Sequence, residues 1–267
     1  MKKIILALML AACSLFSNTL TQIKEKGVIR IGIDGSSPPF SVAKAGEYSG
    51  FEILLIEGLV KEIFGDKGSK IQYVVTVGDD RIKAVQDNRV DLDIALISVT
   101  KEREKLVDFS DPYFSVNIGV LTRSDDNIRK VSDLNGKTIL AQPGTTVFDY
   151  FTKQGYNVVP CASANECFND LKSGKGDGYG DDNLLVFAYA VVDRKVEVNI
   201  KNLGVSDFLG IAVSKGNKDL LEFLNGELVK LSKNGFMKKT YDEAIEPYYK
   251  GTAEKKYFLL DDLYSLF

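Results

Sequence analysis

The sequence predicts an α/β fold built on two sheets. Short apolar runs of strand length alternate with longer amphipathic runs from about residue 28, and this alternation begins again near residue 116. One apolar run, residues 91–97, is bounded by polar residues on both sides, as is typical of a buried parallel strand. With 267 residues, 45% of them hydrophobic, the chain is long enough for one large or two ordinary domains.

The elements follow from periodicity and from helix-ending residues. The first series contains strands at 28–34, 70–77 and 91–97, and helices at 51–64 and 80–88. The second contains strands at 116–122, 137–141, 156–160 and 177–181, and helices at 145–154, 164–171 and 183–193. A last strand at 208–214 and a helix at 218–233 complete the pattern.

Composition excludes several classes of function. A net charge of −3 and a pI near 5.3 give no indication of the basic surface that binding to nucleic acid requires. The chain has no histidine and no Cys-x-x-Cys motif, so the usual transition-metal ligand sets and the Ser-His and Cys-His nucleophile pairs are not available. We therefore expect no metal and no cofactor.

The N-terminus reads as a targeting segment. Lys2 and Lys3 precede an apolar run at 4–12 that is too short to span a bilayer. Leu10-Ala11-Ala12-Cys13 resembles the bacterial lipobox, in which the cysteine is lipidated and becomes the first mature residue, and residues 14–20 would then form a tether. The alternative is an ordinary signal peptide cut at 17–19.

Two further cysteines, Cys161 and Cys167, would remain in an export compartment where disulfides form. A small loop-closing bridge is one possibility. Ser163 and Glu166 also look like a capping box that opens the helix carrying Cys167. Because the distance between the two Cα atoms does not follow from the sequence, both the bridged and the free state stay open.

A candidate anion site follows the strand at 91–97, whose carboxyl end leads to Ser98, Thr100 and Arg103. Ligands of open α/β sheets bind beyond the carboxyl ends of the strands, and hydroxyls with a guanidinium suit a small anion. The alternative is that Arg103 is a solvated charge within residues 101–105.

The spacing of Asp91, Ser98 and Arg103 resembles the periplasmic solute-binding proteins of family 3, the polar amino-acid-binding components of ABC importers. Residues 32–40, 50–52 and 142–146 resemble other parts of that family's cleft. The resemblance implies a two-lobe, Venus-flytrap fold with hinge crossings near 120–123 and 205–210. Lobe 1 would be residues 20–120 plus 209–267, lobe 2 residues 121–208, and residues 1–19 the signal peptide, lipobox and tether.

The same resemblance implies a ligand site divided between the lobes. Arg103, Thr145 and the Thr146 N–H would bind the α-carboxylate, while Asp182, Ser98 and the Leu96 carbonyl would hold the α-ammonium. For Asp182, a role as helix cap is the competing interpretation. The remaining expected ligand residues are Phe40 as an aromatic wall, Asp34 and Arg81.

The ligand class rests on Asp34 and Arg81. Arg81 matches an arginine in the branch that binds acidic amino acids or cysteine, but a carboxylate at Asp34 would repel an acidic ligand unless Arg81 neutralises it. The motifs look most like the cysteine-binding lipoprotein branch. We therefore expect cysteine as the ligand, with glutamine as the second candidate, and consider aspartate and glutamate less favoured.

The expected partners are the permease and ATPase subunits of an ABC importer. The protein would be a monomer in the periplasm of a Gram-negative bacterium, anchored to a membrane through Cys13 if that residue is lipidated. One alternative is an enzyme resembling cyclohexadienyl dehydratase, with Asp34 or Glu52 as general acid. Another is a second role as adhesin or antigen. The tail at 253–267 is expected to pack on lobe 1 as a terminal helix.

Overall fold

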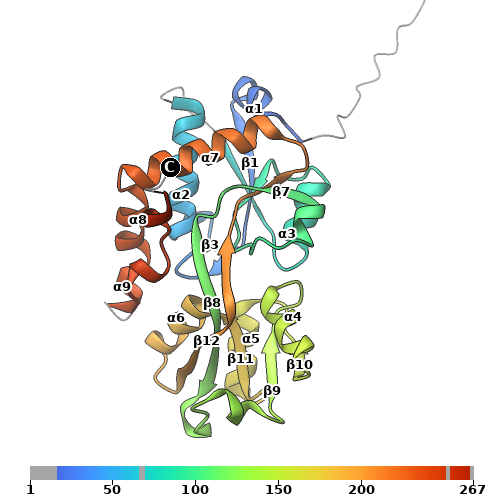
Figure 1. The fold of residues 1–267 in the computed structure, drawn as a ribbon, viewed down its shortest axis with the longest axis vertical. Helices are drawn as coiled ribbons and strands as arrows, with labels where there is room; N and C mark the ends of the chain where they lie inside the picture. Colours follow the sequence, from blue (N-terminus) through green and yellow to red (C-terminus); the bar gives the residue numbers. More distant parts are fainter. Residues whose placement is uncertain (1–16, 66–69, 251–252, 265–267) are drawn as a thin grey trace, which may run out of the picture.

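The computed structural model describes residues 17–65, 70–250 and 253–264. It consists of two lobes, one above the other in Figure 1, and each lobe contains a five-stranded sheet with helices around it. This arrangement confirms the α/β prediction and the two sheets. The proposed signal peptide and the lipobox at Cys13 lie outside the described residues. Among the described helices, none combines the length and the apolar character that crossing a membrane requires.

Lobe 1 is built on a sheet with the strand order β5-β1-β6-β13-β7. Its strands are β1 (Val28–Ile33), β5 (Lys70–Val75), β6 (Leu92–Asp93), β7 (Val107–Phe109) and β13 (Ala212–Ser214). β1 runs parallel to β5 and β6, and β13 runs antiparallel to β6 and β7. Its helices are α1 (Leu20–Lys26), α2 (Phe51–Phe64), α3 (Asp80–Gln86), α7 (Lys218–Lys233) and α8 (Phe236–Ala244). A small sheet of β2 (Ser36–Ser37), β3 (Ser41–Lys44) and β4 (Glu47–Ser49) lies between β1 and α2.

Lobe 2 is built on a sheet with the strand order β10-β9-β11-β8-β12. Its strands are β8 (Phe114–Arg123), β9 (Thr138–Ala141), β10 (Asn157–Pro160), β11 (Gly178–Asp182) and β12 (Val196–Leu209). β9 is parallel to β10 and β11, whereas β8 is antiparallel to β11 and β12. Its helices are α4 (Thr146–Lys153), α5 (Ala164–Ser173) and α6 (Asn183–Val192).

The long strands β8 and β12 join the two lobes and run side by side in Figure 1. Phe114 pairs with Leu209 at one end of this ribbon. Along β8, Val116 packs in the core that contains β1 and α2, while Ile118 packs in a core of lobe 2. The side chains of β8 therefore change lobes earlier than the crossing that we expected at residues 120–123.

The strands differ from the sequence predictions in several places, and the short strands β2, β3, β4 and β7 were not predicted. The run at 91–97 forms only the two-residue strand β6, and farther along it Leu96 adopts a left-handed conformation with φ 54°, which is not that of a strand. The strand expected at 208–214 is divided between β12 and β13. Residues 196–207 were not predicted as a strand, although Val196, Val198 and Ile200 alternate as buried positions in β12.

Both ends of the described chain pack on lobe 1. Asn18, expected in a tether, is 9% exposed and donates from Nδ2 to Asp91 Oδ1 at 2.7 Å. At the other end, α9 (Glu246–Tyr249) and α10 (Asp261–Tyr264) follow α8. Phe258 is buried with its ring stacked on Phe114, and Tyr264 is 3% exposed. The packing of the tail on lobe 1 agrees with the sequence prediction.

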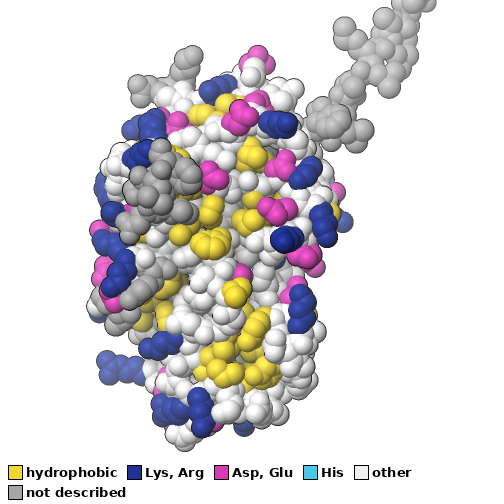
Figure 2. Space-filling model, viewed as in Figure 1, with side chains coloured by type: hydrophobic (Ala, Val, Ile, Leu, Met, Phe, Trp, Pro, Cys, Tyr) yellow, Lys and Arg dark blue, Asp and Glu magenta, His cyan; other side chains and the backbone are white. Residues whose placement is uncertain are grey.

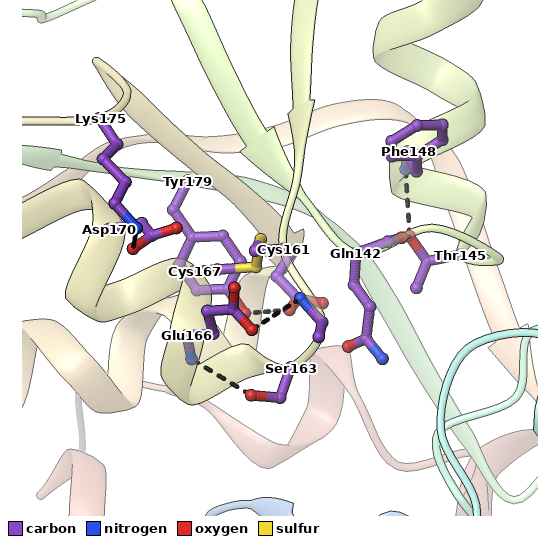
Figure 3. The surroundings of a disulfide bond; sticks show 12 residues. Gln142, Thr145, Phe148, Cys161, Ser163, Glu166, Cys167, Asp170, Lys175 and Tyr179 are labelled. Carbon is purple, nitrogen blue, oxygen red and sulfur yellow. Dashed lines mark hydrogen bonds and ion pairs between the residues drawn. A yellow bond between two sulfur atoms is a disulfide. The ribbon is translucent and has the colours of Figure 1, made fainter.

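Cys161 and Cys167 form a disulfide, with their Cα atoms 5.2 Å apart (Figure 3). The helix cap coexists with this bond, because Ser163 Oγ accepts the N–H of Glu166 at 3.2 Å. The Glu166 carboxylate accepts the N–H of Ala162 rather than that of Ser163. Of the two states that the sequence left open, the structure has the bridged one, and of the capping box it has only the half made by Ser163.

Candidate functional site

A polar cavity lies between the two lobes, and the carboxyl ends of strands from both sheets supply its walls. From lobe 1, Asp34 follows β1 and Leu96 follows β6; from lobe 2, Gln142 follows β9 and Asp182 ends β11. The lining residues are Asp34, Ser37, Arg81, Leu96, Ser98, Arg103, Gln142, Thr145, Thr146, Val147, Asp181, Asp182 and Leu185. All the expected ligand residues except Phe40 are among them.

Phe40 lies elsewhere than we expected. Its side chain is 0% exposed and packs edge-on against Phe51 and Phe114, with ring centroids 6.1 and 5.2 Å away. An aromatic ring surrounded by apolar neighbours gains from complete burial, and this removes it from the polar cleft. Apolar surface in the cavity comes instead from Val147 and Leu185.

Arg103 reaches across the cleft. Its Nη1 donates to the Ser98 carbonyl at 2.7 Å, and its Nη2 donates to the Gly144 carbonyl of lobe 2 at 2.9 Å. Burial and then the positive charge of Arg81 lower the pKa of Arg103 to about 10. The guanidinium is still charged at neutral pH, so Arg103 presents a positive charge to the cavity and is not the solvated surface charge of the alternative interpretation.

Arg81 holds the backbone around the cavity. It is 5% exposed, and its Nε donates to the Gly78 carbonyl at 2.9 Å. Nη1 donates to the carbonyls of Ala95 and Leu96, both at 2.9 Å, and Nη2 donates to the Gly144 carbonyl at 3.0 Å. Arg81 therefore positions the chain on both sides of the cleft and adds a second positive charge there.

Asp34 is fixed by the start of the next loop. Its Oδ1 accepts the N–H and Oγ of Ser36, both at 2.9 Å, and the Oγ of Ser37 at 2.7 Å. Among the described residues no ion pair within 4.0 Å joins Asp34 to Arg81. Neutralisation of Asp34 by direct contact with Arg81, which an acidic ligand would need, is thus not seen.

Two adjacent acids face the cavity from β11. Burial raises the pKa of Asp182 well above its usual range, and the charge of Asp181 adds to this. Asp181 accepts the Tyr179 hydroxyl and the Asp182 N–H, and burial raises its pKa to about 6. Asp182 precedes α6 without a side-chain capping bond, which disfavours the helix-cap interpretation. A cationic group in the cavity would restore the charged form of this pair.

The turn before α4 brings lobe 2 to the cleft. Thr145 caps the helix, since its Oγ1 accepts the Phe148 N–H at 3.1 Å (Figure 3) and donates to the Gln142 carbonyl at 2.8 Å. Thr146 Oγ1 donates to Asp207 Oδ2 at 2.6 Å and lies 3.4 Å from Ser98 Oγ of lobe 1. The Thr146 N–H belongs to the first turn of α4, where backbone donors suit an anion.

Two acids lie buried near the cavity in lobe 1. Glu52 and Asp93 are each 0% exposed, and burial raises the pKa of both to about 7. Glu52 Oε1 accepts the Leu96 N–H at 2.8 Å and the Tyr113 hydroxyl, while Asp93 Oδ2 accepts Thr76 Oγ1 at 2.9 Å. Glu52 thereby supports the backbone of a cavity residue.

Several residues of the site were not named individually from the sequence, although Ser37 and Gln142 lie in the stretches 32–40 and 142–146 that resemble the family's cleft. Ser37, Gln142, Asp181, Val147 and Leu185 line the cavity, and Asp207 orients Thr146. Asp181 stands next to Asp182, so the sequence did contain a signal for a pair of acids. Asp207 lies in a stretch, residues 203–208, that resembles the cysteine-binding branch, but residues 196–207 were not predicted as a strand, so no place in the cleft followed for it. In the part of the chain that the structure describes, no group of three or more acidic or sulfur ligands could hold a metal ion.

Comparison with known proteins places this geometry in a family. Residues 29–247 match the model of the bacterial extracellular solute-binding proteins, family 3. The glutamine-binding protein GlnH of a Bacillus subtilis ABC transporter is 30% identical over 87% of this chain and 85% of its own. A solute receptor for L-cysteine of Neisseria gonorrhoeae is 36% identical, with a TM-score of 0.86 over 91% of this chain and 99% of its own. A cysteine-binding protein from Campylobacter jejuni is 35% identical, with a TM-score of 0.85 over 90% of this chain and 98% of its own.

Proposed function

The chain belongs to family 3 of the bacterial extracellular solute-binding proteins, and we propose that it captures one small polar amino acid between its lobes, cysteine first and glutamine second. The captured amino acid is handed to the permease and ATPase subunits of an ABC-type importer. The protein is an amino-acid-binding solute-binding protein, not an enzyme, in keeping with its relatives.

The observation that carries the proposal is the set of charges around the cavity. Arg81 and Arg103 line the same space as Asp34, Asp181 and Asp182. Among the described residues, no ion pair within 4.0 Å joins any of these five side chains to another charged group. Buried charges are costly unless they are paired, so a ligand with one positive and one negative group suits this cavity. A free amino acid is such a zwitterion.

Each lobe offers part of the complementary charge. The α-carboxylate binds Arg103 of lobe 1 and the Thr146 N–H of lobe 2, with Thr145 shaping the turn. The α-ammonium binds Asp182 of lobe 2, with Ser98 and the Leu96 carbonyl of lobe 1. A ligand divided in this way makes more contacts when the lobes are closed, so it shifts the equilibrium toward closure by that difference in affinity.

We assign lobe 1 to residues 20–120 plus 209–267 and lobe 2 to residues 121–208, with the bending within β8 and β12, where the side chains of Ile118 and Val120 already pack in a core of lobe 2. These two strands are the covalent crossings between the sheets. Closure then brings the carboxyl ends of β1 and β6 toward those of β9 and β11, where the ligand residues lie.

The excess of acids favours a ligand side chain that is neutral or donates a hydrogen bond. Three carboxylates line the cavity against two guanidiniums, and a side-chain carboxylate would add a further negative charge. Aspartate and glutamate are therefore disfavoured. Cysteine comes before glutamine because the two cysteine-binding structures are more similar to this chain than the glutamine-binding relative is.

The protein acts in the periplasm of a Gram-negative bacterium as a monomer held to a membrane by lipid on Cys13. The support for the anchor is the resemblance of residues 10–13 to a lipobox.

The surface also suits a soluble domain, because positive and negative side chains are interspersed on the face in Figure 2. The anchor can be tested separately. Cys13→Ser should release the protein from the membrane fraction on cell fractionation, and retention in that fraction would exclude the lipid anchor.

Thermal shift of the purified protein against the twenty amino acids and cystine tests the ligand assignment, because a ligand that binds only the folded state raises its melting temperature. We expect a selective rise with cysteine or, failing that, glutamine. Arg103→Ala and Asp182→Asn should abolish it. Arg129→Ala, at an exposed arginine paired with Glu197, is the matched control and should retain the shift. An unchanged melting temperature with every amino acid would refute the proposal.

A further inference from the structure

One backbone carbonyl of lobe 2 bonds to two arginines of lobe 1. The carbonyl oxygen of Gly144, in the turn before α4, accepts Arg81 Nη2 at 3.0 Å and Arg103 Nη2 at 2.9 Å. Ser98 and Thr146 meet close by, with their hydroxyl oxygens 3.4 Å apart. The lobes therefore touch beside the ligand cavity, through groups that belong to the protein itself.

The backbones of the two lobes lie so close together at this contact that two glycines, Gly78 and Gly144, have no room for a side chain. A Cβ on Gly144 would lie 2.4 Å from Asp79 Oδ1 and 2.5 Å from the Asp79 backbone nitrogen. Across the cleft, a Cβ on Gly78 would lie 2.7 Å from the Pro143 carbonyl oxygen. Because backbone atoms of the opposite lobe are involved in both cases, a larger residue would hold the lobes apart.

We propose that Gly78 and Gly144 are positioning residues for ligand capture, whose missing side chains let the lobes close until the Gly144 carbonyl lies between Arg81 and Arg103. This inference rests on the proposed function. The shared carbonyl fixes the guanidinium of Arg103 at the cavity wall, where the ligand carboxylate binds. It also joins Arg81, which holds the backbone of Ala95 and Leu96, to the same turn.

The chain supplies a matched control for each glycine. Gly155 has a φ of 79°, close to the 77° of Gly144, and Gly27 has a φ of 65°, close to the 56° of Gly78. Nothing lies within 4 Å of a Cβ added at Gly155 or Gly27. Alanine at each control position therefore carries a similar backbone strain without the contact between lobes.

Lobe closure can be measured without any ligand by trapping the closed form with a disulfide cross-link. Ser98→Cys and Thr146→Cys, introduced into the full chain with Cys13→Ser, place two thiols across the closing contact. The rate of their cross-linking under mild oxidation reports how often the lobes meet. Gly144→Ala and Gly78→Ala should slow this rate by roughly tenfold or more, since it follows the population of the closed form. Gly155→Ala and Gly27→Ala should leave it within about twofold.

Equal rates in all four alanine variants and the parent would overturn the proposal. So would an equal slowing in the two control variants, because backbone strain would then be the cause. With the native Ser98 and Thr146, isothermal titration with cysteine should show Kd raised by a similar factor in Gly144→Ala and Gly78→Ala only. If no amino acid binds the parent protein, the proposed function fails, yet the cross-linking rates still decide the role of the glycines.

Discussion

The carboxylate of Glu52 accepts the backbone N–H of Leu96 at 2.8 Å, which joins the first turn of α2 to the wall of the ligand cavity. Glu52 is completely buried, and Leu96 holds a left-handed backbone conformation at φ 54°. For a residue other than glycine this conformation needs support from its surroundings. Glu52 thus fixes the cavity backbone although it does not line the cavity.

Protonation of Glu52 should make stability depend on pH. Burial raises its pKa from 4.5 to about 7, so between these values the folded state keeps a proton that the unfolded state releases. The contribution to stability is complete below pH ~4.5 and is lost as the pH rises through about 7, by at most ~1.4 kcal/mol per pH unit. In urea unfolding at pH 5 and pH 8, Glu52→Gln should reduce the difference between the two stabilities.

Glu57→Gln, at an exposed position of the same helix, is the control for this measurement. It should leave the pH dependence as it is in the parent protein. Burial also raises the pKa of Asp93 to about 7, so the Glu52→Gln variant should still show part of the pH dependence of stability. A parent protein with equal stability at both pH values would contradict the prediction.

The disulfide should stabilise lobe 2 without affecting ligand binding. It closes a loop with a sequence separation of 6, for which the chain-entropy model gives about 2 kcal/mol. Cys161→Ala combined with Cys167→Ala should lower the free energy of unfolding in urea by about that amount. Reductant should destabilise the parent protein to the same extent and should have no effect on the double variant. A loss of ligand affinity in the double variant would show that the bond also shapes the site.

The C-terminal tail should contribute to the stability of lobe 1. Phe258 is 7% exposed, its ring stacks on Phe114 with centroids 6.0 Å apart, and its carbonyl accepts the Ser115 N–H at 2.9 Å. Phe258→Ala should cost about 3 kcal/mol in urea unfolding. Phe208→Ala is the control, because that ring is 44% exposed; it should cost less than about 0.5 kcal/mol. Similar losses in both variants would mean that the tail does not stabilise the lobe.

Asp207 should act on the ligand through Thr146. Its Oδ2 accepts the Thr146 hydroxyl at 2.6 Å and holds the first residue of α4 in place. Asp207→Ala should weaken ligand binding about tenfold by titration calorimetry, the size of one charged hydrogen bond, while Asp207→Asn keeps an acceptor and most of the affinity. The neighbouring Ser206→Ala, at an exposed side chain, should bind as the parent does. If Asp207→Ala binds the ligand with the same affinity as the parent, Asp207 does not support binding through Thr146.

Local patterns in the sequence were sufficient for much of the fold. The helices at 51–64 and 218–233 were predicted with the bounds that α2 and α7 have, because both carry a periodic apolar face and α2 ends at Gly65. Ser98 was expected beyond the carboxyl end of a strand, where ligands of α/β sheets bind, whereas Asp34 and Asp182 were expected from the family resemblance; all three line the cavity between the two sheets.

The tertiary structure alone decided which side chains are buried and which segments meet. Phe40 was expected in the cleft and lies in the core, because its neighbours Phe51 and Phe114 come from other elements. The burial of Glu52 and the meeting of Gly78 with Pro143 depend on contacts far apart along the chain. Periodicity describes how a segment folds, whereas burial and pKa depend on what packs against it. The sequence by itself therefore determined most helices, the family and most of the expected cavity residues, while packing determined which side chains are buried and how the two lobes meet.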